Sequence, residues 1–206
     1  MHQEAQDHLR SIAPEHNILR MLKVTRSEIG LHSPFLADLL SPYGSHGQGV
    51  LFLQEFLRML AQCAPYPGAP DYRPQLVSIV EQMSERPLPY EWSVGRERQK
   101  IDISIRNQWL AGGLIIFIEN KIDAGEQPNQ LTRYRELLDS LSSYKLRVLV
   151  YLTPGVGPTS GQPHVHITYD DHIRDWLTAC SDAVIAHHVK YNIAQYIDAL
   201  DEFSQD

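Results

Sequence analysis

The sequence predicts an α/β fold, in which helices cover a central β-sheet, and three patterns lead to this prediction. Residues 114–118 read Leu-Ile-Ile-Phe-Ile and are apolar at every position, as expected for a strand buried on both faces. Residues 101–106 alternate isoleucine with Asp102, Ser104 and Arg106, which is the period of a strand with one buried face. Several flanking segments instead repeat their apolar residues at the helical period of about 3.6. Strands and helices that alternate along one chain are typical of the α/β class.

The two strands are expected to form an antiparallel hairpin, because Asn107 and a following Gly-Gly pair between them suit a turn. A strand around residues 90–94 comes before this hairpin, so three strands follow one another as a meander. Residues 146–153 are apolar and β-branched and predict a fourth strand, and residues 164–169 predict a last one.

The helices are predicted from apolar periodicity and from their ends. The first is broken around Gly30 and restarts at Ser33, an N-cap followed by proline. Residues 64–74 hold four prolines and a glycine and must form a loop. Asp170 and Asp171 are expected to cap the helix after the last strand. The expected helices span residues 14–40, 50–63, 75–83, 128–142 and 182–203.

Charged and amide side chains end the apolar strand, where Glu119, Asn120 and Lys121 follow residues 114–118 directly. Because side chains alternate faces at about 3.3 Å per residue, Glu119 and Lys121 share a face about 6.6 Å apart. Adjacent strands lie about 4.8 Å apart, so Asp102 can lie beside Glu119 or diagonally across from it. Two such carboxylates repel unless a cation such as Mg²⁺ lies between them. A lysine next to that cation can hold an attacking water, which predicts metal-assisted phosphodiester hydrolysis.

This pattern resembles the signature of the PD-(D/E)XK nuclease superfamily, an Asp followed at variable distance by Glu-x-Lys on consecutive strands. Gln130 and Tyr134 on the next helix are similar to the Gln-x-x-x-Tyr motif of its RecB-type branch. The segments IDISI, IIFIENKI and EQPNQLTRY are similar to an uncharacterised bacterial and phage group of the superfamily, and the likeness covers about residues 28–152.

The resemblance implies a restriction-endonuclease-like αβββαβ core with extra N-terminal and C-terminal helices. It implies a Mg²⁺- or Mn²⁺-dependent nuclease that acts on nucleic acid, with DNA as the expected polymer. Asp102 and Glu119 would hold the metal with the backbone carbonyl of Asn120, and Lys121 would position the water. One domain is expected over residues 1–206, with a helical layer over 1–85, a catalytic core over about 88–180 and a C-terminal helix over 182–204.

An acidic residue on an early helix often joins the metal site in related folds, which makes Glu28 the first candidate and Glu15 the second. The alternative for Glu28 is an ordinary solvated glutamate. Glu97 lies where the family often has an acidic residue, and an ion pair with a neighbouring arginine ranks before a metal role for it. Gln130 and Tyr134 would face the site, the alternative being an ordinary amphipathic helix.

Basic residues lie on both sides of Asp102, although the net charge of −7 argues against a protein that coats nucleic acid. An even number of positions separates Asp102 from each of Arg96, Arg98, Lys100 and Arg106. An unbroken strand would therefore place these basic side chains on the same face as Asp102, as a track for phosphates. A turn near Gln99 would break this relation and leave a solvated strand edge.

Four histidines are weighed as ligands. For His32 and His46 a structural hydrogen bond is favoured over catalysis. His164 and His166 have the spacing of a strand-borne zinc motif, but the sequence offers no third ligand, so zinc is disfavoured.

Two cysteines far apart, Cys63 and Cys180, indicate neither a disulfide framework nor a cysteine zinc site. The chain has no signal-like apolar segment and no run long enough to cross a membrane, so a cytoplasmic protein without a membrane partner is expected. A homodimer would suit an enzyme that cuts both strands of a DNA duplex.

Two other functions stay open at this point. One is a catalytically inactive nuclease-fold subunit that binds its partner in a defence, repair or toxin complex. The other is a phosphodiesterase for a small phosphorylated substrate, which would fit the acidic charge equally well.

Overall fold

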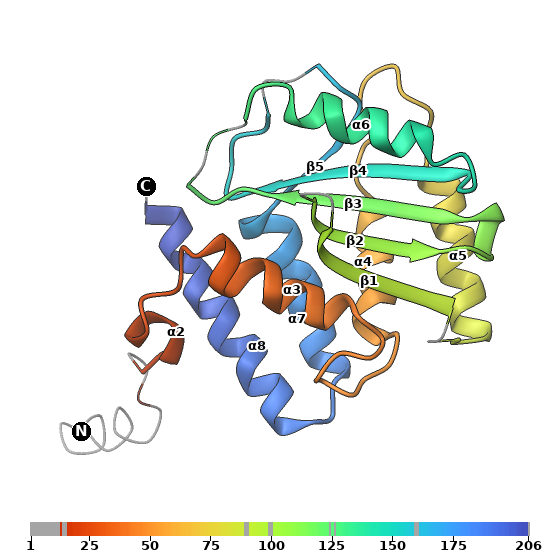
Figure 1. Ribbon diagram of the computed structural model, residues 1–206. Helices are drawn as coiled ribbons and strands as arrows, with labels where there is room; N and C mark the ends of the chain where they lie inside the picture. Colours follow the sequence, from red (N-terminus) through yellow and green to blue (C-terminus); the bar gives the residue numbers. More distant parts are fainter. Residues whose placement is uncertain are drawn as a thin grey trace, which may run out of the picture.

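A mixed five-stranded β-sheet lies at the centre of the computed structural model, which describes residues 13, 16–88, 91–98, 101–123, 125, 127–158 and 161–205 (Figure 1). The sheet order is β1-β2-β3-β4-β5; β1 to β3 pair antiparallel, and β4 and β5 add in parallel to β3. The expected hairpin and α/β class are therefore confirmed. The strands are β1 (Trp92–Arg98), β2 (Ile101–Asn107), β3 (Leu114–Asn120), β4 (Leu146–Thr153) and β5 (Val165–Thr168).

Strand β3 is buried at every position, as its apolar run predicts. Leu114, Ile116 and Ile118 contribute to the larger apolar core, whereas Ile115 and Phe117 point to the opposite face and contribute to a smaller one. This alternation gives a central strand two cores to stabilise it, so the polar residues at its end are held by a rigid element.

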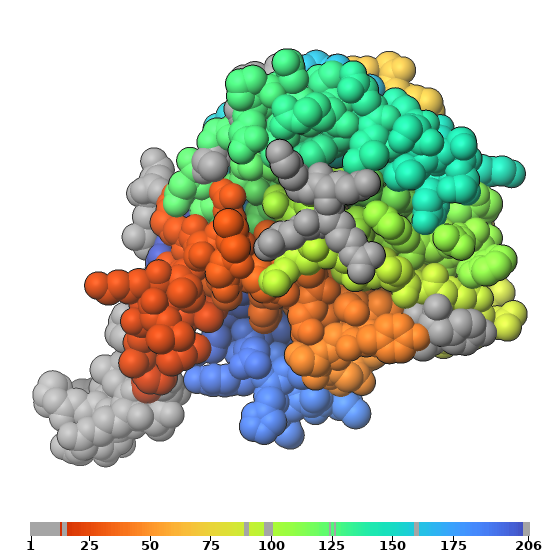
Figure 2. All heavy atoms as spheres, viewed as in Figure 1, coloured from red at the N-terminus to blue at the C-terminus, as the bar shows by residue number. Residues whose placement is uncertain are grey.

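Helices cover both faces of the sheet (Figure 1). Helix α6 packs on β3 and β4 on the side of the smaller core, and the other long helices lie on the side of the larger core. In the space-filling view from the same side, the green atoms at the top of the molecule include those of α6 (Figure 2). The helices are α2 (Ile18–Met21), α3 (Ser33–Leu40), α4 (Leu51–Leu60), α5 (Arg73–Glu85), α6 (Gln130–Ser140), α7 (Arg174–Ala183) and α8 (His187–Ala199); short π or 3₁₀ turns are η1 (Glu28–His32), η3 (Leu110–Gly112), η4 (Tyr169–Ile173) and η5 (Leu200–Gln205).

The N-terminal helix differs from the prediction. Helix α2 ends at Met21, and the chain turns at Lys23, whose φ is 55°. The π-turn η1 then begins after Ser27, whose side chain accepts a hydrogen bond from the N–H of Gly30 at 2.9 Å. Ser33 has helical φ and ψ and continues η1 into α3, so the predicted N-cap at Ser33 is wrong; the capping oxygen belongs to Ser27.

The C-terminal region also differs in its boundaries. Helix α7 extends to Ala183, and the extended backbone at Val184 separates it from α8, so a single helix over residues 182–203 is wrong. The N-terminus of η4 is capped by Thr168, whose hydroxyl accepts from the N–H of Asp171, rather than by an aspartate. Asp170 and Asp171 lie in the first turn of η4, where their negative charge interacts favourably with the helix dipole.

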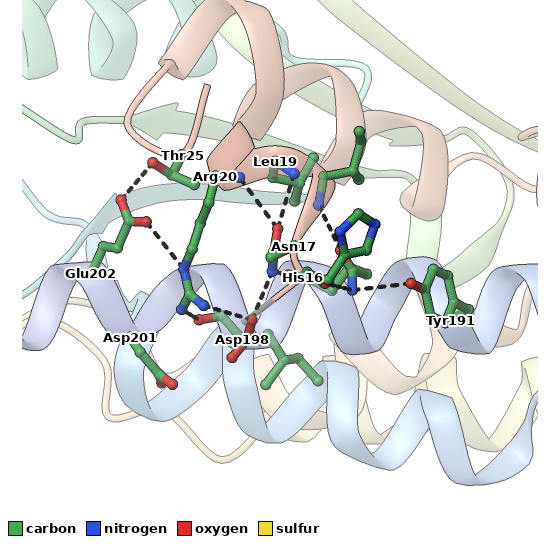
Figure 3. A network of polar contacts seen from close by, with 12 residues as sticks. His16, Asn17, Leu19, Arg20, Thr25, Tyr191, Asp198, Asp201 and Glu202 are labelled. Atoms are coloured by element: carbon green, nitrogen blue, oxygen red, sulfur yellow. Dashed lines mark hydrogen bonds and ion pairs between the residues drawn. The ribbon is translucent and has the colours of Figure 1, made fainter. Parts of the chain in front are cut away.

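Helix α2 is fastened to α8 by a polar network (Figure 3). The amide of Asn17 donates to the carbonyl of Gln195 and to Asp198, both at 2.8 Å. Arg20 binds Asp198 and Glu202, and the hydroxyl of Thr25 donates to Glu202. The two ends of the described chain are thus joined on one side of the molecule.

Candidate active site

The site lies where β2 and β3 separate. The last ladder pair is Ile103 with Ile118, and the same register continued by one residue sets Asp102 opposite Glu119. Beyond the ladder, Oδ2 of Asp102 accepts a hydrogen bond from the backbone N–H of Asn120 at 2.8 Å. This bond replaces the missing ladder bond and fixes the carboxylate beside the end of β3.

Glu119 and Lys121 converge on the same face of β3. The Nζ of Lys121 lies 2.6 Å from Oε1 of Glu119, and the two residues are only 8 % and 1 % exposed. Oε2 of Glu119 is buried and has no hydrogen-bond partner among the described residues. A buried carboxylate oxygen without a donor is costly, so this atom is suited to bind a ligand.

The electrostatics of the pair reflect a concentration of negative charge. Burial, and then the nearby charge of Asp102, raise the pKa of Glu119 to about 7, although Lys121 opposes the shift. Burial tends to lower the pKa of Lys121, but its hydrogen bond to Glu119 and the charges of Glu119, Asp102 and Glu28 outweigh burial and raise it. Lys121 is therefore held as a cation between carboxylates.

Glu28 reaches the same edge from η1. Its Oε1 accepts a hydrogen bond from the N–H of Ile122 at 2.7 Å, one residue after Lys121. The structure thus brings Glu28 near the strand end that carries Glu119 and Lys121. Glu15 lies outside the described residues.

Asn120 points its side chain away from Glu119, into the larger core. Its Nδ2 donates to the hydroxyl of Ser33 at 3.1 Å, and its Oδ1 accepts from the hydroxyl of Tyr169 at 2.8 Å. Asn120 and Tyr169 are both fully buried. Sequence reasoning missed Ser33 and Tyr169 as supports, because contacts 87 and 49 residues apart leave no local pattern.

Gln130 and Tyr134 face the site from the first turns of α6. The Nε2 of Gln130 donates to Oε1 of Glu119 at 2.5 Å and to the hydroxyl of Tyr134 at 3.1 Å. Both side chains are 4 % exposed. This placement differs from a solvated amphipathic helix and makes Gln130 the neighbour that orients Glu119.

The predicted phosphate track is wrong for Arg96. The chain reverses between Arg98 and Ile101, and Arg96 pairs across the ladder with Ile103, so it shares a face with Ile103 rather than with Asp102. Arg106 lies four residues after Asp102 on the same strand, β2, and therefore shares a face of the sheet with it. The side chains of Arg98 and Glu97, and all of Lys100, lie outside the described residues.

The four histidines make structural contacts. His32 bonds to Tyr196 and to the carbonyl of Thr25, and His46 to the carbonyl of Ser41. His164 lies 2.7 Å from the carbonyl of Gln162, and His166 2.9 Å from the hydroxyl of Thr153. Among the described residues, no three His, Cys, Asp or Glu side chains form a group that could hold a metal ion.

The donor set nevertheless fits a hard divalent cation. Carboxylate oxygens are the ligands that Mg²⁺ and Mn²⁺ prefer. The partnerless Oε2 of Glu119 and the repulsion between Asp102 and Glu119 are both relieved by positive charge at this point. The carboxylates of Asp102 and Glu119 and the amine of Lys121 lie together at the end of β3. These are the residues that the sequence motif predicts for the site.

A mixed sheet that carries an Asp and a Glu-x-Lys at the ends of adjacent strands is the arrangement of the restriction-endonuclease-like fold. The family model described as the PD-(D/E)XK nuclease superfamily matches residues 16–200, so the chain belongs to this superfamily. The resemblance to this superfamily, stated from the motifs, is thereby confirmed. No curated protein and no solved structure matches the chain significantly. In the described part of the chain, no helix is both long and apolar enough to cross a membrane.

Proposed function

We propose that this protein is a metal-dependent nuclease that hydrolyses phosphodiester bonds of nucleic acid, with DNA as the expected substrate and Mg²⁺ or Mn²⁺ as the cofactor. The observation that carries the proposal is the buried contact of 2.6 Å between Lys121 and Glu119, with Asp102 anchored to the neighbouring residue. Membership of the superfamily supports the same chemistry.

Each residue has a distinct part in the proposed reaction. Asp102 and Glu119 would hold the divalent ion, with the backbone carbonyl of Asn120 and with Glu28 as further oxygen donors. Such an ion, when bound, would supply positive charge that offsets the negative charge of the reacting phosphate. Lys121 orients the attacking water and stabilises the developing negative charge. Gln130 keeps the carboxylate of Glu119 in one orientation through its hydrogen bond.

Substrate cleavage by matched variants tests this proposal. Plasmid and single-stranded DNA are incubated with the wild type, Asp102→Ala, Lys121→Ala and the distant Lys190→Ala, each with Mg²⁺, Mn²⁺ or EDTA. We expect metal-dependent cleavage that falls at least about 10²-fold in the first two variants and is unchanged in the third. Circular dichroism checks that every variant is folded.

Two results would overturn the proposal. Cleavage that survives both substitutions assigns the activity to another site or to a contaminant. No cleavage of either DNA substrate, combined with metal-independent binding of nucleic acid or protein, favours the inactive binding subunit.

A further inference from the structure

An open cavity of about 540 Å³, with a lining of polar and apolar residues, lies on the side of the protein away from the candidate active site. It is lined by the loop between α4 and α5, the second half of α6, the beginning of β4 and the segment before β5. Its volume is in the range of pockets that hold small organic ligands.

The cavity is separate from the catalytic edge. Arg147 lines it and lies four residues before Tyr151, the residue of β4 that pairs with Glu119. At about 3.3 Å per residue this places Arg147 about 13 Å from the catalytic end of the sheet. None of the proposed metal-binding residues lines the cavity.

The lining carries positive charge that the protein itself does not neutralise. Its two carboxylates are already engaged, Asp71 with Arg73 at 2.7 Å and Asp139 with Arg135 at 2.6 Å. Lys145 and Arg147 have no acidic partner among the described residues. In a chain of net charge −7, two uncompensated cations at one cavity favour an anionic ligand.

Planar and hydrogen-bonding groups lie beside these cations. The rings of Tyr66 and His164 both line the cavity and lie 5.2 Å apart. Strand β5 pairs only with Val150 to Thr153, so the first half of β4, which also lines the cavity, has no strand partner on that side within the described structure. A ligand ring that packs on Tyr66 could therefore form hydrogen bonds with the main-chain N–H and C=O groups of the first half of β4.

We propose that this cavity binds a nucleotide, with the phosphate held by Lys145 and Arg147 and the base packed on Tyr66. A phosphate and a planar, hydrogen-bonding base together match the two halves of the lining. The ligand can be a free nucleotide or the phosphorylated end of a nucleic-acid strand, because both present the same groups. The proposal does not depend on the nuclease activity, which uses the other end of the sheet.

Calorimetric titration of the full chain tests the proposal. AMP, ATP, inorganic phosphate and a 5′-phosphorylated oligonucleotide are titrated in EDTA, so that no metal-dependent cleavage occurs. We expect the nucleotides to bind and phosphate alone to bind at least about tenfold more weakly. A preference for AMP or ATP identifies a free nucleotide, and an oligonucleotide that binds more tightly than the same strand without its 5′-phosphate identifies a strand end; either supports the proposal.

Matched variants locate the binding. Arg147→Gln and Lys145→Gln should each weaken nucleotide binding by about tenfold or more, since each removes a charge-assisted hydrogen bond. Tyr66→Ala should weaken it and Tyr66→Phe should not, because phenylalanine keeps the ring. Lys190→Gln, an equal loss of charge elsewhere, should bind like the wild type, and Lys121→Ala, at the other end of the sheet, should bind AMP and ATP like the wild type.

Three results would overturn the proposal. They are the absence of nucleotide binding at millimolar concentration, an equal loss of binding in Lys190→Gln, and a loss in Lys121→Ala that the pocket variants do not share. Failure of DNA cleavage would leave this result unaffected, so the two proposals can be judged separately.

Discussion

The hydroxyl of Tyr169 donates a hydrogen bond to Oδ1 of Asn120 at 2.8 Å, and this bond ties the C-terminal half of the protein to the strand that carries the candidate site. Asn120 lies between Glu119 and Lys121, and its N–H holds Asp102. Burial, together with the neighbouring Tyr196, raises the pKa of Tyr169 well above its usual range, so its hydroxyl stays protonated and remains a donor. We therefore expect the orientation of this strand end to depend on a residue that has no part in the proposed reaction.

Tyr169→Phe should lower stability and slow catalysis without changing substrate affinity. The change leaves the buried Oδ1 of Asn120 without a donor, which costs about 1–3 kcal/mol of unfolding free energy. We expect kcat to fall while KM stays near the wild-type value, because Tyr169 supports the strand rather than the substrate. Urea unfolding and steady-state cleavage measure the two effects.

Tyr144→Phe is the matched control for this substitution. Tyr144 is also buried, and its hydroxyl has no hydrogen bond among the described residues, so its loss should change stability by less than about 0.5 kcal/mol. Equal effects of the two variants would show that the bond to Asn120 does not matter.

His32 should make the protein less stable in mild acid. Its ring is 1 % exposed. Its Nε2 must donate to the carbonyl of Thr25, so Nδ1 accepts from Tyr196 and the ring is neutral. Burial lowers the pKa of His32 from 6.5 to about 4.

The sign of this effect follows from proton binding. Above pH 6.5 the ring is neutral in both states, whereas between about 6.5 and 4 the unfolded chain binds the proton first, so stability falls as pH falls. The loss approaches about 3 kcal/mol over this range. Urea unfolding at several pH values should show a shallower pH dependence for His32→Gln than for the wild type, while the exposed His188→Gln should keep the wild-type slope. Identical slopes for wild type and His32→Gln would contradict the assignment.

The metal-free protein should titrate at Glu119 near neutrality. Its pKa is raised to about 7 by burial first and by the charge of Asp102 second. Asp102→Asn removes the second cause and should shift the titration of the Glu119 carboxyl to lower pH, as carbon-13 NMR can measure. Since a metal ion must displace this proton, affinity for Mn²⁺ should increase by up to about tenfold per pH unit below this pKa and level off above it. An affinity for Mn²⁺ that does not vary across this range would refute the involvement of Glu119.

Local patterns predicted the parts of the fold that depend on burial along a strand. The apolar run of β3 and the alternating isoleucines of β2 identified both strands and their hairpin, because side-chain period reports directly which face is buried. The predicted phosphate track is wrong at Arg96, because counting every second residue identifies one face only within an uninterrupted strand. Here the chain reverses after Arg98, between β1 and β2. The bond from Tyr169 to Asn120 could not be predicted, since it joins residues that only the packed tertiary structure brings together.

The turn between β2 and β3 gives a test of the hairpin that presents Asp102 to Glu119. Gly113 has φ of 98°, and a Cβ built on it would lie 2.9 Å from the backbone carbonyl oxygen of Ser143. Gly113→Ala should therefore lower the unfolding free energy by about 1–3 kcal/mol, through backbone strain and this close approach. Gly155→Ala is the control, because a Cβ there meets no atom within 4 Å and Gly155 is not among the glycines of positive φ. Thermal unfolding should show a lower Tm for Gly113→Ala alone. Cleavage measured well below that Tm should match the wild type, because the turn lies at the end of the hairpin opposite the proposed catalytic residues. Loss of cleavage by folded Gly113→Ala would instead show that the turn sets the register of Asp102 against Glu119.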